Sequence, residues 1–330
     1  MMAKKIAVIS TGGTIASQYD PETASMVATM SATDLIETAS IKDADFELVA
    51  SEYGRINSYN LRFDTLIKIA NDLNSILADA DLLGAVIMQG TDTLEEAAYF
   101  LDLIVDSEKP IVMIGAQLTP EHPQCDGPRN LSDALRTVSA DEMRGCGVMV
   151  GFNGQLHASR EVVKMHTSAL ETFSSLNYGH LGVVDEGTVI RYRTPVERPH
   201  YALSAMADSK VALVKCVMDA DGFLVDAAVD AGVDGLVIEA FGRGNVVDTF
   251  VPGICRAIER NIPVVIASRS LMGRVKPIYG ASGGGKMLED IGVVFAGDLS
   301  AQKARVLLMV LLAMGFDGRQ LAAELQRNAC

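Results

Sequence analysis

The chain has 330 residues, of which 49% are hydrophobic and 21% charged, a composition typical of soluble globular proteins with one large or two medium domains. Its formal net charge of −14 argues against a nucleic-acid partner, because binding phosphates requires clustered Lys and Arg. No run of about 20 apolar residues is free of charges, and the apolar start is too short for a signal peptide, so we expect a cytoplasmic protein without a membrane partner.

The first half of the chain alternates between short apolar runs and longer helical patterns. Four runs, at 5–11, 82–90, 109–116 and 145–152, are apolar enough for strands buried on both faces. Between them, residues 61–77, 92–105 and 127–138 carry apolar side chains at helical spacing. This alternation predicts an α/β domain, residues 1–190, with a mostly parallel sheet flanked by helices.

A change in composition divides the chain near residue 200. The stretch "RYRTPVERPHYALSA" holds two prolines and no sustained period, which predicts a linker over residues 191–209. Strand patterns then return at 211–218, 234–242, 262–270 and 292–297, with helical patterns near 249–260, 300–314 and 318–327. We therefore expect a second, smaller α/β domain over residues 210–330.

The stretch "STGGTIAS", residues 10–17, follows the first predicted strand. A turn needs glycine where φ is positive or where backbone approaches closely, but it does not need the β-branched Thr11 and Thr14. Open α/β sheets bind ligands where their strands end. A simple strand-to-helix turn is the competing interpretation.

A second polar turn follows the predicted strand at 82–90. In "MQGTDTLEEAAYFL", Thr91, Asp92 and Thr93 precede a helical pattern. One of them could cap the helix, with Glu95 or Glu96 favouring its dipole. Capping needs only one such residue, so three in a row favour a functional site.

Lys164 lies in "ASREVVKMHTSALETF", where most neighbours are polar or small. A solvated surface lysine is the ordinary interpretation. A lysine enclosed near threonines could instead lose its proton and act as a base, because desolvation disfavours the charged form.

Other motifs predict neither a nucleotide nor a metal. "GRGNVV" lacks the third glycine of a dinucleotide motif, and "GASGGGKM" ends in Met287 where a hydroxyl would bind magnesium. The five histidines show no metal-ligand spacing, and the five scattered cysteines include no CxxC pair.

Taken together, these stretches resemble the bacterial-type L-asparaginase family over essentially the whole chain. "TGGTIA" and "GTDTLEE" match the family's two signature motifs, and four further elements match in order: "DGPRNL", "KMHTSAL", the "GRGN" step and "FAGDLSAQKARVLLM". The resemblance implies hydrolysis of the side-chain amide of L-asparagine, with L-glutamine as a side substrate, and no metal or cofactor.

The resemblance also assigns roles to residues. It implies that Thr11 is the nucleophile of an acyl-enzyme, activated by a nearby base because a hydroxyl is a poor nucleophile. It implies that Thr91 and Lys164 handle the proton and that Asp92, counted with them among the catalytic residues, binds the substrate's α-ammonium. The implied substrate-binding residues are Gly12, Ser58, Tyr59, Gly90, Asp92, Asn245 and Tyr279.

Three of these assignments carry further expectations. Ser58 aligns with the serine that holds the α-carboxylate, but Tyr59 stands where the family has a small or amide side chain. Asn245 and, more weakly, Tyr279 align with residues that a neighbouring subunit contributes. The family forms homotetramers built from two intimate dimers, and we expect the same assembly here.

Two other functions compete with an asparaginase. One is the ammonia-supplying component of a tRNA-dependent amidotransferase, which normally has an extra N-terminal domain, whereas this chain begins at its first predicted strand. The other is a noncatalytic sensor of acidic amino acids, which would not need the two threonines with Lys164.

Overall fold

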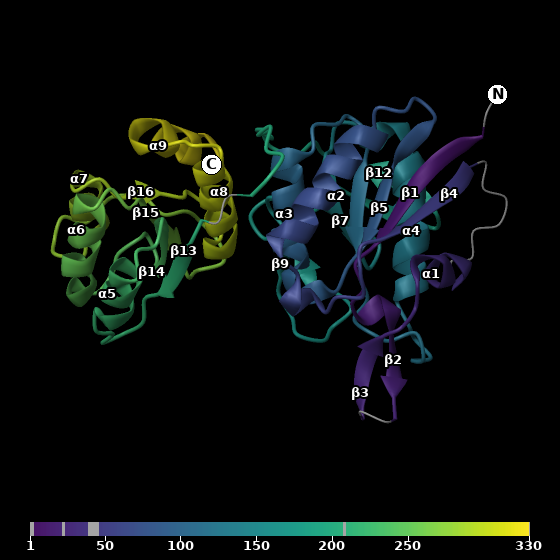
Figure 1. The fold of residues 1–330 in the computed structure, drawn as a ribbon, viewed down its shortest axis with the longest axis horizontal. Helices are drawn as coiled ribbons and strands as arrows, with labels where there is room; N and C mark the ends of the chain where they lie inside the picture. Colours follow the sequence, from purple (N-terminus) through teal and green to yellow (C-terminus); the bar gives the residue numbers. More distant parts are fainter. Residues whose placement is uncertain (1–2, 22–23, 39–45, 207–208, 330) are drawn as a thin grey trace. The chain divides into compact units, whose positions relative to one another are not determined.

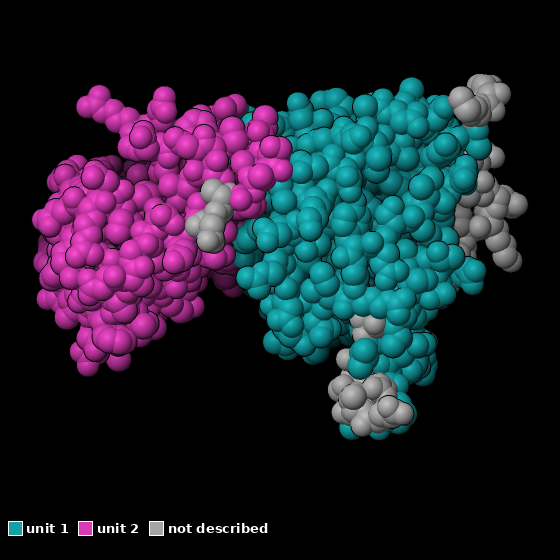
Figure 2. Space-filling model, in the orientation of Figure 1, with its two compact units in different colours: residues 1–200 teal, residues 201–330 magenta. Residues whose placement is uncertain are grey.

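The computed structural model describes residues 3–21, 24–38, 46–206 and 209–329. The chain divides into two compact units, residues 1–200 and 201–330 (Figures 1 and 2). Each unit is a mostly parallel sheet flanked by helices, and the first is the larger. The predicted two-domain α/β fold is therefore confirmed.

The first unit is built on an eight-stranded sheet in the order β12-β11-β8-β7-β6-β5-β1-β4. The five strands from β4 to β7 in this order are mutually parallel, and β8, β11 and β12 extend the sheet in antiparallel fashion. The strands are β1 (Lys4–Ser10), β4 (Phe46–Glu52), β5 (Leu82–Met88), β6 (Ile111–Ile114), β7 (Val148–Phe152), β8 (Gln155–Ala158), β11 (Gly182–Asp185) and β12 (Thr188–Arg191).

Helices cover both faces of this sheet. On one face, Ile6 and Val8 of β1 belong to the same core cluster as Leu131 and Leu135 of α4 (Gly127–Ser139). The short helix α1 (Ala32–Thr38) contacts α4 on this face. The other face is covered by α2 (Phe63–Ile76) and α3 (Leu94–Ile104), joined by ring contact between Phe63 and Phe100 at 5.0 Å. The central strands β1, β5, β6 and β7 are buried along most of their length, which explains why their sequences are largely apolar.

Several strands lie outside the sequence prediction. The edge strand β4 is mostly exposed and therefore lacks an apolar run. The β7–β8 hairpin turns at Asn153 and Gly154, whose φ values of 49° and 77° are those of a tight hairpin turn, a signal present in the letters "NG". Two small antiparallel pairs complete the unit: β2 (Ser17–Asp20) with β3 (Ser25–Ala28), and β9 (Val163–Lys164) with β10 (Phe173–Ser174).

The second unit holds the parallel sheet β13-β14-β15-β16. Its strands are β13 (Val211–Lys215), β14 (Gly235–Ala240), β15 (Val264–Ser268) and β16 (Val294–Phe295). One face packs on α8 (Ala301–Ala313), and the other on α5 (Phe223–Asp230) and α6 (Val251–Glu259). Two further helices are α7 (Gly285–Asp290) and α9 (Gly318–Arg327). The predicted helices near 249–260, 300–314 and 318–327 are thus present, whereas α5 and α7 are additional.

The segment after β12 contains no helix or strand among residues 192–206, and residues 207–208 of the expected linker lie outside the described residues. Arg198 fastens this segment to the first unit, because its guanidinium contacts Asp102 at 2.8 Å and donates to the Gly145 carbonyl at 3.2 Å. This explains why the first unit extends to His200. In the described part of the chain, no helix is long and apolar enough to cross a bilayer.

Candidate active site

The two threonine-containing turns leave neighbouring strands at the same edge of the sheet. Ser10, the last residue of β1, pairs in parallel with Met88, the last residue of β5. The Thr11 amide continues this pairing by donating to the Met88 carbonyl at 3.0 Å. Two segments 77 positions apart in the sequence therefore meet at the carboxyl ends of parallel strands, where open α/β sheets bind their ligands.

Glycine permits the two turns to touch. Gly13 has a φ of +91°, and a Cβ there would lie 2.2 Å from the Gly90 nitrogen. A Cβ on Gly90 would in turn lie 2.7 Å from Ser58 Oγ. Both positions therefore require glycine for close backbone approach, as the sequence suggested for the first turn.

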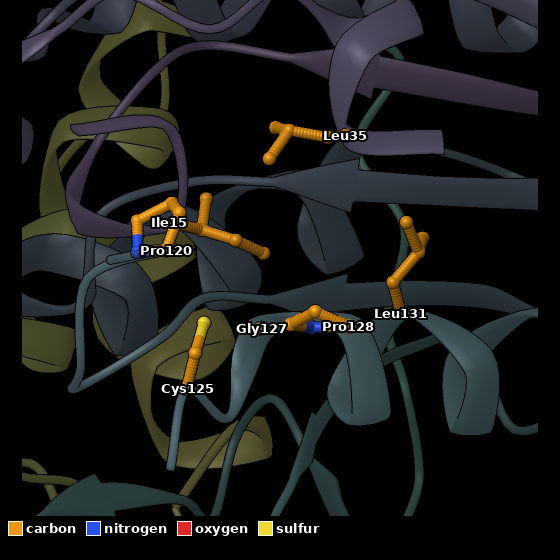
Figure 3. Close-up of a pocket in the computed structure, with 7 residues that line it drawn as sticks. All are labelled: Ile15, Leu35, Pro120, Cys125, Gly127, Pro128 and Leu131. Atoms are coloured by element: carbon orange, nitrogen blue, oxygen red, sulfur yellow. The ribbon is translucent and has the colours of Figure 1, made fainter. Parts of the chain in front are cut away.

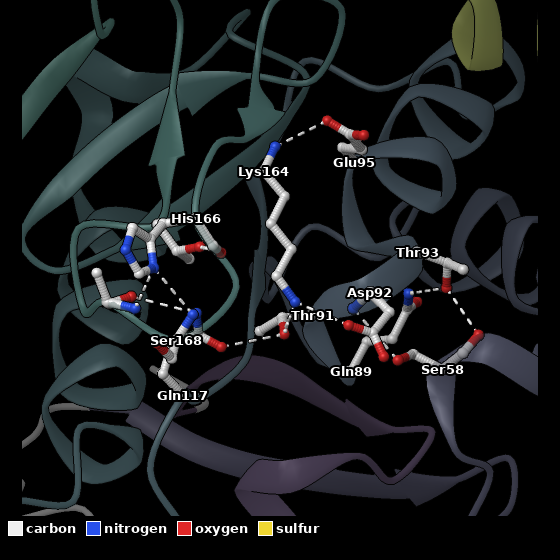
Figure 4. A network of polar contacts seen from close by, with 12 residues as sticks. Ser58, Gln89, Thr91, Asp92, Thr93, Glu95, Gln117, Lys164, His166 and Ser168 are labelled. Carbon is white, nitrogen blue, oxygen red and sulfur yellow. Dashed lines mark hydrogen bonds and ion pairs between the residues drawn. The ribbon is translucent and has the colours of Figure 1, made fainter.

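Lys164 extends from β9 to the second turn, where Thr91–Thr93 form the 3₁₀ turn η3 (Figure 4). Its Nζ donates to Thr91 Oγ1 and to Asp92 Oδ1, each at 2.8 Å. Its backbone amide donates to Glu95 Oε2 at 3.0 Å, so the lysine is held at both ends by one motif. The side chain is only 16% exposed, which is not the environment of a solvated surface lysine.

Ser58 joins this cluster from η2 (Ser58–Asn60), whereas Tyr59 does not. The Asp92 amide donates to Ser58 Oγ at 3.3 Å, and the Thr93 hydroxyl donates to the Ser58 carbonyl at 2.9 Å. Tyr59 is 67% exposed, and its hydroxyl accepts a hydrogen bond from Asn57 Nδ2 at 3.0 Å.

Thr11 is placed next to this cluster by its backbone. Its side chain is buried, and its hydroxyl donates to the Met88 carbonyl at 3.2 Å. Among the hydrogen bonds of the described residues, none joins Thr11 to Thr91 or Lys164. The hydroxyl hydrogen of Thr11 is thus directed at the Met88 carbonyl. Gly12, with a φ of +101°, follows directly.

The remaining two predicted residues belong to the second unit and adjoin one loop there. Asn245 Oδ1 accepts a hydrogen bond at 3.1 Å from the amide of Gly285, the first residue of α7. The Tyr279 carbonyl accepts from the Lys286 amide at 2.9 Å, and its side chain is 55% exposed. Asn245 thus has a structural role in the loop before α7.

Sequence reasoning did not assign roles to Glu95 at the Lys164 amide, to Gln117 or to Asp126. Gln117 follows β6, and its Oε1 accepts the Thr91 hydroxyl hydrogen at 3.3 Å. The Asp126 carboxylate accepts the backbone amides of Gln117 and Leu118 at 2.9–3.1 Å and so fixes this loop. Glu95 lies four residues after Thr91, and residues at this spacing lie on the same side of a helical turn. This spacing could have indicated that Glu95 lies on the Thr91 side of the helix, where it binds the Lys164 amide.

A separate hollow lies between the first turn and α4 (Figure 3). It encloses about 380 Å³ of empty space, part of it open to solvent, and is lined by Ile15, Leu35, Pro120, Cys125, Gly127, Pro128 and Leu131. None of these seven described side chains is charged, so they offer no counter-charge to an amino acid. Burial raises the pKa of the Cys125 thiol, which keeps it protonated and a poor nucleophile near neutral pH.

Within the described part of the chain, no group of three or more His, Cys, Asp or Glu side chains is arranged to hold a metal ion. The cysteines described, Cys125, Cys146, Cys216 and Cys255, are free thiols, and Cys330 lies outside the described residues. The polar groups that the described cluster brings together are the hydroxyls of Thr91 and Ser58, the carboxylate of Asp92 and the ammonium of Lys164.

Comparison with known proteins identifies the family. Residues 5–197 match the model "Asparaginase, N-terminal", and residues 210–324 match "Glutaminase/Asparaginase C-terminal domain". The chain is 34% identical to the L-asparaginase of Bacillus licheniformis over 96% of this chain and 98% of the relative. It is also 31% identical to a component of the glutamyl-tRNA(Gln) amidotransferase of Methanobrevibacter smithii, over 98% of this chain and 76% of that protein. The crystal structure of a probable cytoplasmic L-asparaginase from Campylobacter jejuni superposes with a TM-score of 0.85 at 28% identity, covering 98% of both chains. The chain belongs to the asparaginase family.

Proposed function

We propose that this protein hydrolyses the side-chain amide of L-asparagine to give L-aspartate and ammonia. The observation that carries the proposal is the 2.8 Å contact between Lys164 Nζ and Thr91 Oγ1, beside Thr11 at the shared strand edge. A hydroxyl is a weak nucleophile unless a base is near, and Lys164 of this cluster is the group proposed to act as that base.

In the proposed reaction, Thr11 Oγ1 attacks the amide carbon and its proton passes through Thr91 to neutral Lys164. The amide nitrogen takes this proton back from Lys164 and leaves as ammonia, while Thr11 stays bound to the acyl group as an ester. Water then attacks that ester, the carbon–oxygen bond to Thr11 breaks, and a proton of the water restores the Thr11 hydroxyl as aspartate is released.

The cluster also contains groups suited to the rest of the substrate. Asp92 is more than half exposed, so its carboxylate is available to an α-ammonium. Ser58 Oγ, beside Gly90, is suited to the α-carboxylate. This arrangement supports an amino acid as the substrate because it presents a carboxylate to the α-ammonium and a neutral hydroxyl donor to the α-carboxylate.

The finer parts of the proposal are a side activity on L-glutamine and a homotetramer of two intimate dimers, both implied by the family resemblance, and a cytoplasmic location, which the similarity to the probable cytoplasmic L-asparaginase of Campylobacter jejuni supports. Asn245 and Tyr279 would contribute from the second unit of a neighbouring subunit.

An ammonia-supplying component of a tRNA-dependent amidotransferase is the second candidate, and the similarity to the Methanobrevibacter smithii protein favours it. Both functions share the same amide chemistry, so the substrate distinguishes them. An asparaginase acts on the free amino acid without tRNA. A noncatalytic sensor would bind the amino acid and release no ammonia.

The decisive experiment measures ammonia release from free asparagine and glutamine by purified protein. We expect turnover of asparagine, loss of turnover in Thr11→Ala by orders of magnitude, and unchanged turnover in Thr188→Val, which alters an exposed threonine on β12. Mass spectrometry after acid quenching should detect an adduct on the peptide containing Thr11. Near-normal turnover by Thr11→Ala would exclude the mechanism.

A further inference from the structure

The Thr91 hydroxyl has Gln117 as a second polar neighbour in addition to Lys164 (Figure 4). Thr91 Oγ1 is 2.8 Å from Lys164 Nζ and 3.3 Å from Gln117 Oε1. The two neighbours come from different segments, β9 and the loop after β6. The Thr91 hydroxyl therefore has two polar partners that can compete for its hydrogen.

The orientation of the Gln117 amide follows from its second contact. Gln117 Nε2 donates to the Ala169 carbonyl at 3.2 Å. A carbonyl oxygen can only accept, so the amide nitrogen must face Ala169 and the amide oxygen must face Thr91. This removes the usual ambiguity of a glutamine side chain.

Both sides of this contact are anchored. The Gln117 backbone amide donates to both Asp126 oxygens at 3.0 and 3.1 Å. On the other side, the amides of Ser168 and Ala169 donate to His166 Nδ1 at 3.0 Å each, which fixes the loop that carries the Ala169 carbonyl. The Gln117 oxygen is therefore held in place as an acceptor for Thr91.

An amide oxygen accepts a hydrogen bond but is not a base, so a Thr91 hydrogen directed at Gln117 is not available to Lys164. In that arrangement Thr91 accepts from Lys164, which suits the charged ammonium. If Lys164 is neutral, the lone pair on its Nζ can instead accept a hydrogen bond from the Thr91 hydroxyl. Gln117 thus stabilises the arrangement in which Lys164 is charged.

We propose that Gln117 is a positioning residue that directs the Thr91 hydroxyl away from Lys164 and so sets the pH at which Lys164 becomes an effective base. This inference rests on the proposed function for its kinetic test, because there the neutral lysine accepts the proton of Thr11.

Several charged or titratable groups surround Lys164 and stay in place when Gln117 is changed. Asp92 contacts the ammonium, Glu95 binds the Lys164 amide, Asp126 binds the loop of Gln117, and His166 holds the Ala169 loop. A neutral substitution at position 117 therefore removes the two hydrogen bonds of the amide, to Thr91 and to Ala169, without changing the charges around Lys164.

Two variants are expected to shift the pH dependence of kcat in opposite directions. Gln117→Met keeps the length of the side chain but removes the acceptor for the Thr91 hydroxyl. The pH at which kcat reaches half its maximum on the acidic side (the midpoint) should therefore fall by about half to one pH unit, the size expected from the loss of one hydrogen bond to Thr91. Gln117→Glu keeps an acceptor and adds a negative charge within about 6 Å of the ammonium, so the midpoint should rise by about one unit. Gln124→Met, an exposed glutamine of the same loop, is the matched control and should keep the wild-type midpoint.

A purely structural role of Gln117 would leave the midpoint of Gln117→Met at the wild-type value, whereas the charge added in Gln117→Glu raises the midpoint in either case. An unchanged or raised midpoint in Gln117→Met would therefore overturn the inference, and a lowered one supports it. If wild-type protein released no ammonia from asparagine, the proposed function would fail instead.

Neutron diffraction from crystals of the deuterated protein tests the arrangement independently of activity. We expect deuterium on Thr91 Oγ1 directed at Gln117 Oε1, and both amide deuterons of Gln117 on the nitrogen that faces Ala169. A Gln117 nitrogen facing Thr91 would contradict the inference even in an active enzyme.

Discussion

The ammonium of Lys164 donates to the hydroxyl of Thr91 over 2.8 Å, although 73 positions separate the two residues in the sequence. The contact forms because β9 carries Lys164 to the turn that follows β5, and Glu95 of α3 binds the lysine's backbone amide there. Since a proton transfer needs donor and acceptor at hydrogen-bond distance, this pair is the part of the site best prepared for general acid–base chemistry.

Lys164→Met should lower kcat by on the order of 100-fold or more, because methionine retains the apolar stem but cannot take up a proton. The KM for asparagine should change much less. Steady-state kinetics beside Lys68→Met, which alters an exposed lysine of α2, would check this. Equal kinetics of the two variants would remove Lys164 from the mechanism.

Asp92→Asn should raise the KM for asparagine by about 10- to 100-fold, the range expected when one charge-assisted hydrogen bond is lost. It also removes the charge beside Lys164, so some loss of kcat is expected as well. Asp185→Asn, at an exposed position on β11, is the control. An unchanged KM and kcat would show that Asp92 does not bind the α-ammonium.

Gly13→Ala should destabilise the protein and reduce its activity, because the new Cβ would lie 2.2 Å from the Gly90 nitrogen. Gly179→Ala is the control that measures backbone strain alone. Gly179 also has a positive φ, but a Cβ added there would have no atom within 4 Å. Gly179→Ala should cost about 1–2 kcal/mol of unfolding free energy, and Gly13→Ala more. Denaturant unfolding of both variants measures the difference, and equal losses would contradict the close approach of the two turns.

Asp133→Asn should raise the melting temperature at pH 7. Burial raises the pKa of the Asp133 carboxyl, with Arg129 and Arg136 acting in the opposite direction. A carboxyl whose pKa is higher in the folded state binds its proton more tightly there, so its contribution to stability is largest at low pH and is lost as the pH rises through the folded pKa. The increase in melting temperature caused by Asp133→Asn should therefore become smaller as the pH falls towards about 4, the ordinary pKa of an aspartate. A gain that is the same at both pH values would not fit this explanation.

The sequence predicts the parallel core and much of the site because both depend on local pattern. β5 and the central residues of β1 are apolar, and each strand is followed by a polar turn, so Thr11 and Thr91 can be placed at one sheet edge. Gln117 could not be found in this way, because its role depends on a contact with the distant Ala169 carbonyl. The edge strand β4 was missed for a related reason: it is held by pairing with β1 rather than by an apolar run of its own.

Asn245 provides the test of a site shared between subunits. If a partner's second unit completes each site, then mixing inactive Thr11→Ala subunits with inactive Asn245→Asp subunits should restore activity. Random pairing makes half of the intimate dimers mixed, and in each of these one site receives both wild-type residues, so about a quarter of the wild-type activity is expected. Mixing Thr11→Ala with Lys164→Met is the control, because both residues lie in the first unit and every site would remain defective. Ammonia release is measured after mass spectrometry of the intact assembly has verified subunit exchange. No recovery in the first mixture would place Asn245 in its own chain's site or outside the site.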